Sequence, residues 1–305
     1  MKKLILTSLC TLAFASAFGQ QAEVDEQQGY WRPILDKTPD TFWNTQLGYV
    51  FPAKPDFKAW DDIGIFEISG EGNFWYTETD FGGDFHLKGD LDAFILNGFD
   101  GVSSGYPMVA ARLNLLYSQR FIDGYGMQTE LMPGLYSTLD GLTGKDFALP
   151  FSLAAVKDVS PGFGALLGLS IYPGFDQTVD PKVALRWEIS DDPDPGKPAY
   201  LTAEIGYPES KIRYTPDDEW ALVGGFRMWN WPEFQMDEED ARERIMFDES
   251  RLFIGAELPF DEAVLGYVEA GYAFGRTIDF ENNKAQAEVD LDNAPYLKIG
   301  MGGRW

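Results

Sequence analysis

Cysteine and histidine are almost missing from this chain of 305 residues, which contains one of each, Cys10 and His86. Basic residues are also scarce, because 24 Lys and Arg stand against 49 Asp and Glu and leave a formal net charge of −25. A protein that binds nucleic acid without preference for a base sequence must neutralise the phosphates with Lys and Arg. The composition therefore excludes nucleic acid as a partner. A single cysteine also excludes an internal disulfide.

Long hydrophobic runs are confined to the first twenty residues. Two lysines near the start precede an apolar run over 4–14, and small residues follow at 15–19. This run is too short to span ~30 Å of hydrocarbon, and its flanks are typical of a secretory signal peptide. We therefore predict that residues 1–19 are a cleaved signal peptide and that the mature chain leaves the cytoplasm. Cleavage removes Cys10, so the mature protein has no thiol chemistry and no disulfide.

Helical signals are weak beyond this segment, whereas strand alternation runs through the whole chain. No later apolar run approaches the length of a membrane helix. Apolar and polar residues instead alternate with period 2, as expected of strands with two different faces. Strands are predicted at 43–51, 63–77, 83–96, 107–120, 125–137, 147–157, 163–172, 182–189, 199–206, 209–215, 219–229, 248–258, 263–274 and 296–305.

Such alternation is typical of a transmembrane barrel and also of a soluble β-sandwich. Three features favour the barrel: many apolar positions are Gly or Ala, short and long connections alternate, and the last strand ends on Trp305. We predict an all-β fold, a closed antiparallel transmembrane β-barrel of about 12–14 strands over residues 43–305. Residues 20–42 are predicted to form a periplasmic N-terminal tail. A single-chain bacterial barrel has an even number of strands.

The connections allow a more detailed prediction. Links 121–124, 215–218 and 259–262 are short and belong to the periplasmic end, whereas 230–247 and 275–295 are among the long outer loops. The long link 190–198 and the short link 207–210 break this rule. They suggest that one of the two strands around 199–215 is false. The charged stretch 237–246 has no apolar stripe and is predicted to be a loop.

The polar face of the strands carries acids and bases in balance, and we assign it to the lumen. The lumen-facing candidates are Glu67, Glu71, His86, Lys88, Asp90, Asp92, Arg112, Arg120, Glu130, Arg186, Glu188, Arg227, Arg251, Glu257, Glu269, Lys298 and Arg304. The excess negative charge must then lie in the loops and the tail. A balanced lumen predicts either a salt-bridged plug or a weakly selective pore.

Four short motifs resemble a known family when they are taken together. They are LPFSLA at 149–154, SPGFGALLG at 160–168 with Tyr172-Pro173 after it, GYAF at 271–274 and DNAPYL at 292–297. As a set spread over about 105–305, they resemble a family of bacterial outer-membrane β-barrel proteins that is defined only as a domain of unknown function. The resemblance implies the fold and the outer-membrane location. It brings no activity and no catalytic residues.

An enzyme would need His86 as its base, because no other histidine is present, with Ser69 or Ser118 as nucleophile from a neighbouring strand. No local signature supports this chemistry. Acidic segments such as 191–194 and 290–293 lack the spacing of an EF-hand calcium loop. We therefore predict no catalytic residues, no cofactor and no dedicated metal site, and at most loosely bound divalent cations at the acidic loops.

The sequence thus predicts an integral outer-membrane protein of a Gram-negative-type bacterium, either a passive pore for small solutes or a structural barrel of the envelope. The alternatives are an outer-membrane lipid-modifying enzyme that uses His86 and a soluble periplasmic β-sandwich binding protein. The expected partners are outer-membrane lipids, lipopolysaccharide and the barrel-assembly machinery, which would bind the C-terminal strand.

Overall fold

The computed structural model describes residues 42–56, 62–79, 82–97, 106–121, 124–138, 142, 144–160, 162–175, 179–189, 200–217, 220–230, 233–238, 241–260, 264–282 and 285–304. The predicted signal peptide, residues 20–41 of the predicted tail and Trp305 lie outside these residues. The elements are β1 Phe42–Ala53, β2 Ile63–Glu78, β3 Gly83–Asn97, β4 Tyr106–Arg120, β5 Tyr125–Leu131, β6 Gly134–Ser137, the 3-10 turn η3 Gly144–Asp146, β7 Phe147–Ala148, β8 Phe151–Ser160, β9 Phe163–Ile171, β10 Val179–Ile189, β11 Leu201–Tyr207, β12 Glu209–Asp217, β13 Trp220–Asn230, β14 Phe234–Glu238, β15 Ala241–Pro259, β16 Val264–Asn282, β17 Ala285–Leu291 and β18 Ala294–Arg304.

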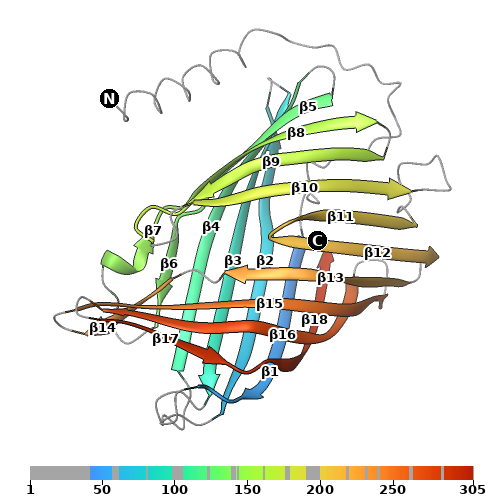
Figure 1. The fold of residues 1–305 in the computed structure, drawn as a ribbon. Helices are drawn as coiled ribbons and strands as arrows, with labels where there is room; N and C mark the ends of the chain where they lie inside the picture. The colour runs from blue at the N-terminus through green and yellow to red at the C-terminus, as the bar shows by residue number, and fades with distance from the viewer. Residues whose placement is uncertain are drawn as a thin grey trace.

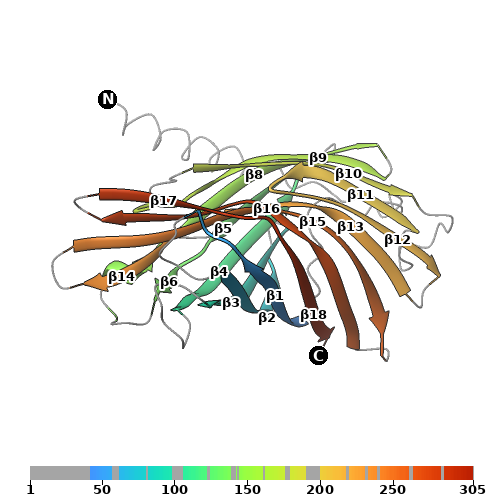
Figure 2. The ribbon, with the colours of Figure 1, turned by 60° about the horizontal axis from the view of Figure 1, so that its bottom comes forward.

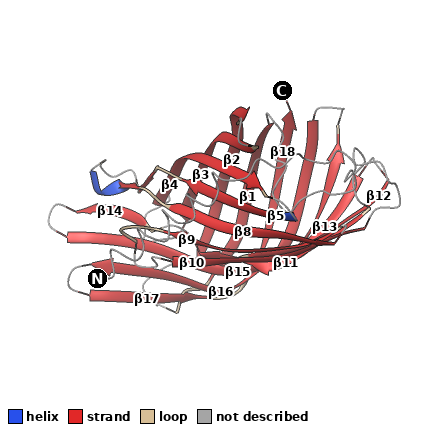
Figure 3. Cartoon of the chain, turned by 90° about the horizontal axis from the view of Figure 1, so that it is seen from above, coloured by secondary structure: helices blue, strands red, loops and turns tan. Residues whose placement is uncertain are grey.

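The sheet closes on itself because β1 pairs with both β2 and β18 (Figure 1). The closed ring runs β1-β2-β3-β4-β5-β8-β9-β10-β11-β12-β13-β15-β16-β18, and each neighbouring pair is antiparallel. That is fourteen strands, within the predicted range and even in number. Seen from above, the strands enclose an interior (Figure 3). Closure gives the strands of the wall neighbours on both sides, so a lipid-exposed sheet edge is avoided.

The outer face of this ring is apolar. Along β10, exposed and half-buried residues alternate without exception, and the exposed ones include Val183, Leu185 and Trp187. Leu167 on β9 is 67% exposed and Ile254 on β15 is 65% exposed. A soluble protein would bury such side chains, whereas lipid contact requires them on the surface. The predicted all-β barrel fold is confirmed, and the sandwich alternative is wrong.

Both strands around 199–215 are real, which corrects the suggestion that one of them is false. Strands β11 and β12 pair in register from Leu201 opposite Tyr214 to Glu204 opposite Lys211, and Pro208 alone separates them. The Ser210 hydroxyl donates to the Gly206 carbonyl at 3.0 Å and accepts from the Gly206 amide at 3.0 Å. These side-chain bonds replace the backbone bonds of a longer turn, so a very short link suffices.

Two stretches predicted as outer loops are instead hairpins that extend the wall, and this is a second correction. Strand β14 pairs with the first part of β15, and β17 pairs with the last part of β16. The hairpins project past the neighbouring strands in Figure 2. The register of the first hairpin places Asp237 opposite Arg242. Residues of opposite charge at facing positions favour strand pairing, so a charged segment without an apolar stripe can still form a hairpin.

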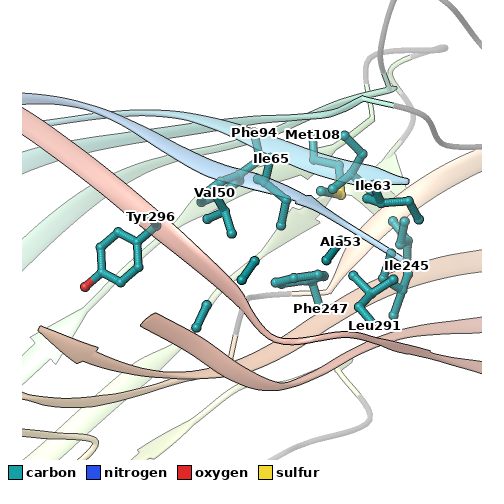
Figure 4. Packing of buried hydrophobic residues seen from close by; sticks show 14 of the residues in the cluster. Val50, Ala53, Ile63, Ile65, Phe94, Met108, Ile245, Phe247, Leu291 and Tyr296 are labelled. Atoms are coloured by element: carbon teal, nitrogen blue, oxygen red, sulfur yellow. The ribbon is translucent and has the colours of Figure 1, made fainter. Parts of the chain in front are cut away.

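The outer end of the barrel, where these hairpins lie, is packed with apolar side chains on the inside. Val50, Ile65 and Phe94 come from β1 to β3, and Ile245 and Phe247 come from β15 (Figure 4). All five are buried, four of them at 0% exposure. Side chains from opposite parts of the wall therefore meet across this end of the interior, where they exclude water.

Candidate functional site in the barrel interior

The predicted lumen residues lie on the strand face opposite the exposed apolar face. The register places Glu71 opposite Asp90, Asp90 opposite Arg112, and Glu269 opposite Lys298. His86, Lys88 and Asp92 share the face of Asp90 on β3, because they differ from it by an even number of positions. Arg304 lies opposite Phe42 in the pairing of β18 with β1.

One group of these charges is fully buried and crosses the interior. Arg251 on β15 donates from Nη1 to Oε2 of Glu67 on β2 at 3.0 Å, and it also bonds Glu249. Arg276 donates from Nε to Glu249 Oε2 at 3.2 Å, and Lys298 Nζ lies 3.8 Å from Glu67 Oε2. Since β16, β18 and β1 separate β15 from β2 around the ring, this contact joins two distant parts of the wall. We call these five residues the interior brace.

Sequence reasoning identified three members of the brace and missed Glu249 and Arg276. Arg276 lay in a segment predicted to be a loop, and Glu249 stands one residue inside a strand boundary. A register shift between β15 and β16 at Glu249 turns Arg276 inward, whereas Glu249 keeps the same face of β15 as Arg251. Gly275 has a φ of 57°, a conformation that side chains with a Cβ rarely adopt. The only signal in the sequence was that Glu249 stands two residues before Arg251 and therefore shares its face of the strand.

A second polar group surrounds Glu269, which is also fully buried. Tyr296 donates its hydroxyl to Glu269 Oε1 at 2.6 Å, and Tyr267 donates to the other carboxylate oxygen. Arg227 Nη1 lies 3.7 Å from Glu269 Oε1, and its Nε donates to Glu209 at 3.0 Å. Buried charges are tolerated only when they are paired and hydrogen-bonded in this way.

The wall formed by β10 to β12 differs, because solvent reaches its inner charges. Every inward residue of β10 from Asp180 to Glu188 is half-buried rather than buried. Lys182 Nζ lies 3.8 Å from Glu130, and Arg186 Nη2 lies 2.6 Å from Glu188. The Lys182 side chain is 34% exposed, whereas that of Arg251 is 0% exposed. The interior therefore has a dry side and a water-accessible side.

His86 is buried on β3, where its side chain contacts Asn73 and Tyr76. Its Nδ1 lies 3.1 Å from the Asn73 amide nitrogen, and its ring packs on Tyr76 with centroids 4.9 Å apart. Ser69 is opposite Asp92 in register, six residues from His86 along β3, which is about 20 Å at ~3.3 Å per residue. Ser118 is opposite Asp84, a diagonal neighbour at roughly 7–8 Å between Cα atoms.

In the part of the chain that the structure describes, no group of three or more His, Cys, Asp or Glu is arranged to hold a metal ion. No helix there is long and apolar enough to cross a membrane.

A closed antiparallel ring with an apolar exterior and a charged interior defines the class: the protein is a transmembrane β-barrel of the outer membrane. No family model and no curated protein matches the chain. Among solved structures, the NanC porin matches with 8% identity over 86% of this chain and 100% of its own, at a TM-score of 0.40. The KdgM porin matches with 7% identity over 87% and 99%, at 0.34. The deltaS2 mutant of the TodX monoaromatic hydrocarbon channel matches with 6% identity over 87% and 90%, at 0.35.

Proposed function

We propose that the protein is a passive pore for small polar solutes, with its water path along the inner face of β10 to β12. The observation that supports this is the partial exposure of every inward residue on β10 from Asp180 to Glu188. Charged side chains at this wall are paired and also accessible to solvent. Side chains that are accessible inside a closed wall require a water-filled space beside them.

The pore is expected to be narrow. A fourteen-stranded barrel can enclose a lumen unless side chains fill it. In this barrel the interior brace and the apolar cluster fill the side next to β1, β2 and β15 to β18. The remaining path is therefore restricted to one side of the interior, which favours small solutes.

The path is also expected to select weakly between ions. Its bases Lys182, Arg186 and Arg213 each lie beside an acid, and Arg213 Nε donates to Glu257 at 2.8 Å. Rings of one charge sign produce strong selectivity, whereas alternating signs cancel. Cations and anions should therefore pass at similar rates.

Conductance in planar bilayers tests the proposal. We expect discrete steps with a reversal potential near zero in a salt gradient, and a shift toward cation selectivity in Lys182→Glu. Lys157→Glu provides a charge-matched control, because Lys157 lies on the outer face of β8 and not on the lumen side. Its Nζ lies 3.6 Å from the centroid of the Tyr125 ring. An absence of steps above leak at high protein input would overturn the pore.

A second candidate is a structural barrel of the envelope, favoured by the interior brace. A pore gains nothing from burying Arg251 and Glu67 across its lumen, whereas a rigid wall does. This candidate predicts no conductance together with high resistance of the folded barrel to heating in detergent. The same bilayer recordings therefore decide between the two.

We propose no catalytic role for His86, because its Nδ1 contacts Asn73 and its ring packs on Tyr76. The contacts with lipids, lipopolysaccharide and the barrel-assembly machinery, and the loosely bound divalent cations, stay predictions. If acidic loops bridge divalent cations to lipopolysaccharide, a chelator should lower the thermal stability of the barrel in native membranes. Unchanged stability would count against this partner.

A further inference from the structure

A cavity of about 190 Å³ lies at the outer end of the barrel, apart from the charged wall described above. It is lined by β6, η3, the segment after β9 and the β14–β15 hairpin, and one side of it is open. The side chains that matter for its chemistry are Tyr136, Lys145, Asp146, Phe175, Glu233 and Arg244. Segments far apart in the chain build it, which is typical of a binding site rather than of a gap within one loop.

One part of the cavity lining is aromatic. The rings of Tyr136 and Phe175 meet edge to face, with centroids 5.1 Å apart and planes at 87°. Tyr172 stacks on Phe175 with centroids 5.8 Å apart, so the Phe175 ring is supported by a neighbour. Tyr136 is buried, and Phe175 is half-buried where it reaches the cavity. Fixed aromatic rings provide flat apolar surfaces for a ligand ring.

The other part of the lining is polar but has no net charge. Arg244 donates from Nη1 to Glu233 Oε2 at 2.9 Å, and Glu233 is buried. Lys145 and Asp146 are neighbours on η3 and carry opposite charges. The lining thus offers both hydrogen-bond donors and hydrogen-bond acceptors, and its acids and bases are equal in number. A charged ligand would have to break the Glu233–Arg244 pair and leave one member uncompensated, which is costly when the pair is buried.

We propose that this cavity binds a single uncharged, hydroxyl-rich ring, that is, one neutral sugar unit. The C–H face of such a ring packs on Phe175, and its hydroxyls exchange hydrogen bonds with Glu233 and Arg244 without disturbing their charge balance. The volume is below the ~300–1,000 Å³ of sites for drug-sized ligands, which limits the occupant to about one ring.

The position of the cavity links it to the proposed pore. Tyr172 directly follows β9, and β10 begins opposite the end of β9, at Val179 opposite Ile171. Lys182 of the water-accessible wall lies three residues further along β10. A sugar released from the cavity would therefore enter beside this wall. The inference deepens the proposed function by naming a solute class, and only the passage of the sugar depends on that function.

Equilibrium binding to the purified full chain in detergent tests the site. D-glucose is the probe, with D-glucuronate as the anionic comparison and L-phenylalanine as the zwitterionic one, each followed by titration calorimetry. We expect saturable glucose binding in the millimolar range and no saturable binding of the other two. Preferred binding of phenylalanine, or no glucose binding, would overturn the proposal.

Three variants make the test specific. Phe175→Ala should weaken glucose binding at least ~10-fold, because it removes the stacking surface. Phe74→Ala is the matched control, since Phe74 is 59% exposed on β2 and does not line the cavity. Glu233→Gln keeps the shape and leaves Arg244 positive, so it should gain affinity for glucuronate. Equal losses in the Phe175 and Phe74 variants would indicate a general folding effect and contradict the site.

Bilayer recordings of the same preparations separate this inference from the proposed pore. Conductance without glucose binding would overturn the sugar site and leave the pore standing. Glucose binding without conductance would overturn the pore and support the site. If both hold, glucose should reduce the current of the original chain, and the Phe175→Ala variant should show the reduction only at ~10-fold higher sugar concentration.

Discussion

Arg251 and Glu67 meet inside the barrel, with Nη1 and Oε2 3.0 Å apart, although 184 residues separate them in the chain. Both side chains are buried, and Glu249 and Lys298 complete their surroundings. The contact joins β15 to β2 across the interior rather than along the sheet. The pair therefore connects two parts of the wall directly across the interior, whereas backbone hydrogen bonds join only neighbouring strands around the ring.

Removing one partner of this pair should destabilise the barrel strongly. Arg251→Met leaves Glu67 buried without its main counter-charge, and we expect a loss of about 3–5 kcal/mol in the free energy of unfolding. The double variant Arg251→Met with Glu67→Met should recover much of this loss, because no unpaired charge is left. Denaturant unfolding in lipid vesicles, followed by tryptophan fluorescence, measures both. Equal stability of the single variant and the original chain would show that the pair is not an interior brace.

A charged side chain on the outer face should destabilise the barrel when it lies near the middle of a membrane-spanning strand. Ile254 is 65% exposed on β15, and Ile254→Arg is expected to lower the free energy of unfolding in lipid by about 2–4 kcal/mol. Ile254→Leu keeps the apolar contact and serves as the control. Measuring both in vesicles checks the expectation. An arginine tolerated as well as leucine would mean that this face does not contact hydrocarbon.

Two glycines on different faces should respond differently to an added methyl group. A Cβ on Gly271 would lie 2.5 Å from Cε1 of Tyr296 and 2.4 Å from the Leu252 carbonyl oxygen. On Gly224 the nearest atom, the Phe253 carbonyl oxygen, is 3.5 Å away. We expect Gly271→Ala to cost about 1–3 kcal/mol through overpacking and Gly224→Ala to be nearly neutral. The temperature at which the folded band disappears on a semi-denaturing gel compares the two, and a reversed order would contradict the packing of Tyr296.

The outer hairpins should be more stable at acid pH. Asp248 lies on the outer side of the register shift in β15, and burial, with Asp279 and Asp180 nearby, raises its pKa from the ordinary 3.8 to about 6. A raised pKa means that the folded state binds a proton more tightly than the unfolded state. The stabilising contribution is therefore complete below about pH 4 and is lost as the pH rises through about 6.

Burial and the neighbouring acids Glu288 and Asp290 also raise the pKa of Asp279. Amide hydrogen exchange of β14 to β17 at pH 4 and pH 7 measures the effect, after correction for the intrinsic exchange rate. Asp248→Asn should protect the hairpins at pH 7 and remove part of the pH dependence. Protection that rises with pH in the original chain would contradict this assignment.

Much of the wall could be predicted from the sequence because alternation with period 2 is a local property. Residues such as Asp90 and Arg112 reveal their face by their immediate neighbours alone. The same rule located the fourteen strands of the ring, but β15 begins seven residues before the predicted strand, β16 ends eight residues after it, and the predicted strand 125–137 is divided into β5 and β6. It failed where charge hid the pattern, as in the β14–β15 hairpin, where the Asp237 and Arg242 positions pair across strands.

The interior brace and the outer cavity, unlike the strands of the wall, depend on contacts between distant parts of the chain. The partner of Arg251 cannot be inferred from spacing, because Glu67 becomes its neighbour only when the ring closes and the wall curves. The aromatic and polar sides of the outer cavity likewise meet only after β6, η3 and β14 fold together. Phe175 and Arg244 had no sequence signal, since Phe175 lies beyond the strand predicted at 163–172 and Arg244 lies in a segment predicted to be a loop.

The sequence by itself determined strands with one apolar face and one charge-balanced face, because the period of a strand assigns each side chain to a face regardless of what lies beyond it. The tertiary structure alone decided which inner charges are dry and which are wet. That division depends on how far apart the opposite walls stand, as the contrast between Arg251 and Lys182 shows. Distance across a barrel follows from closure and register around the whole ring, and no local pattern encodes it.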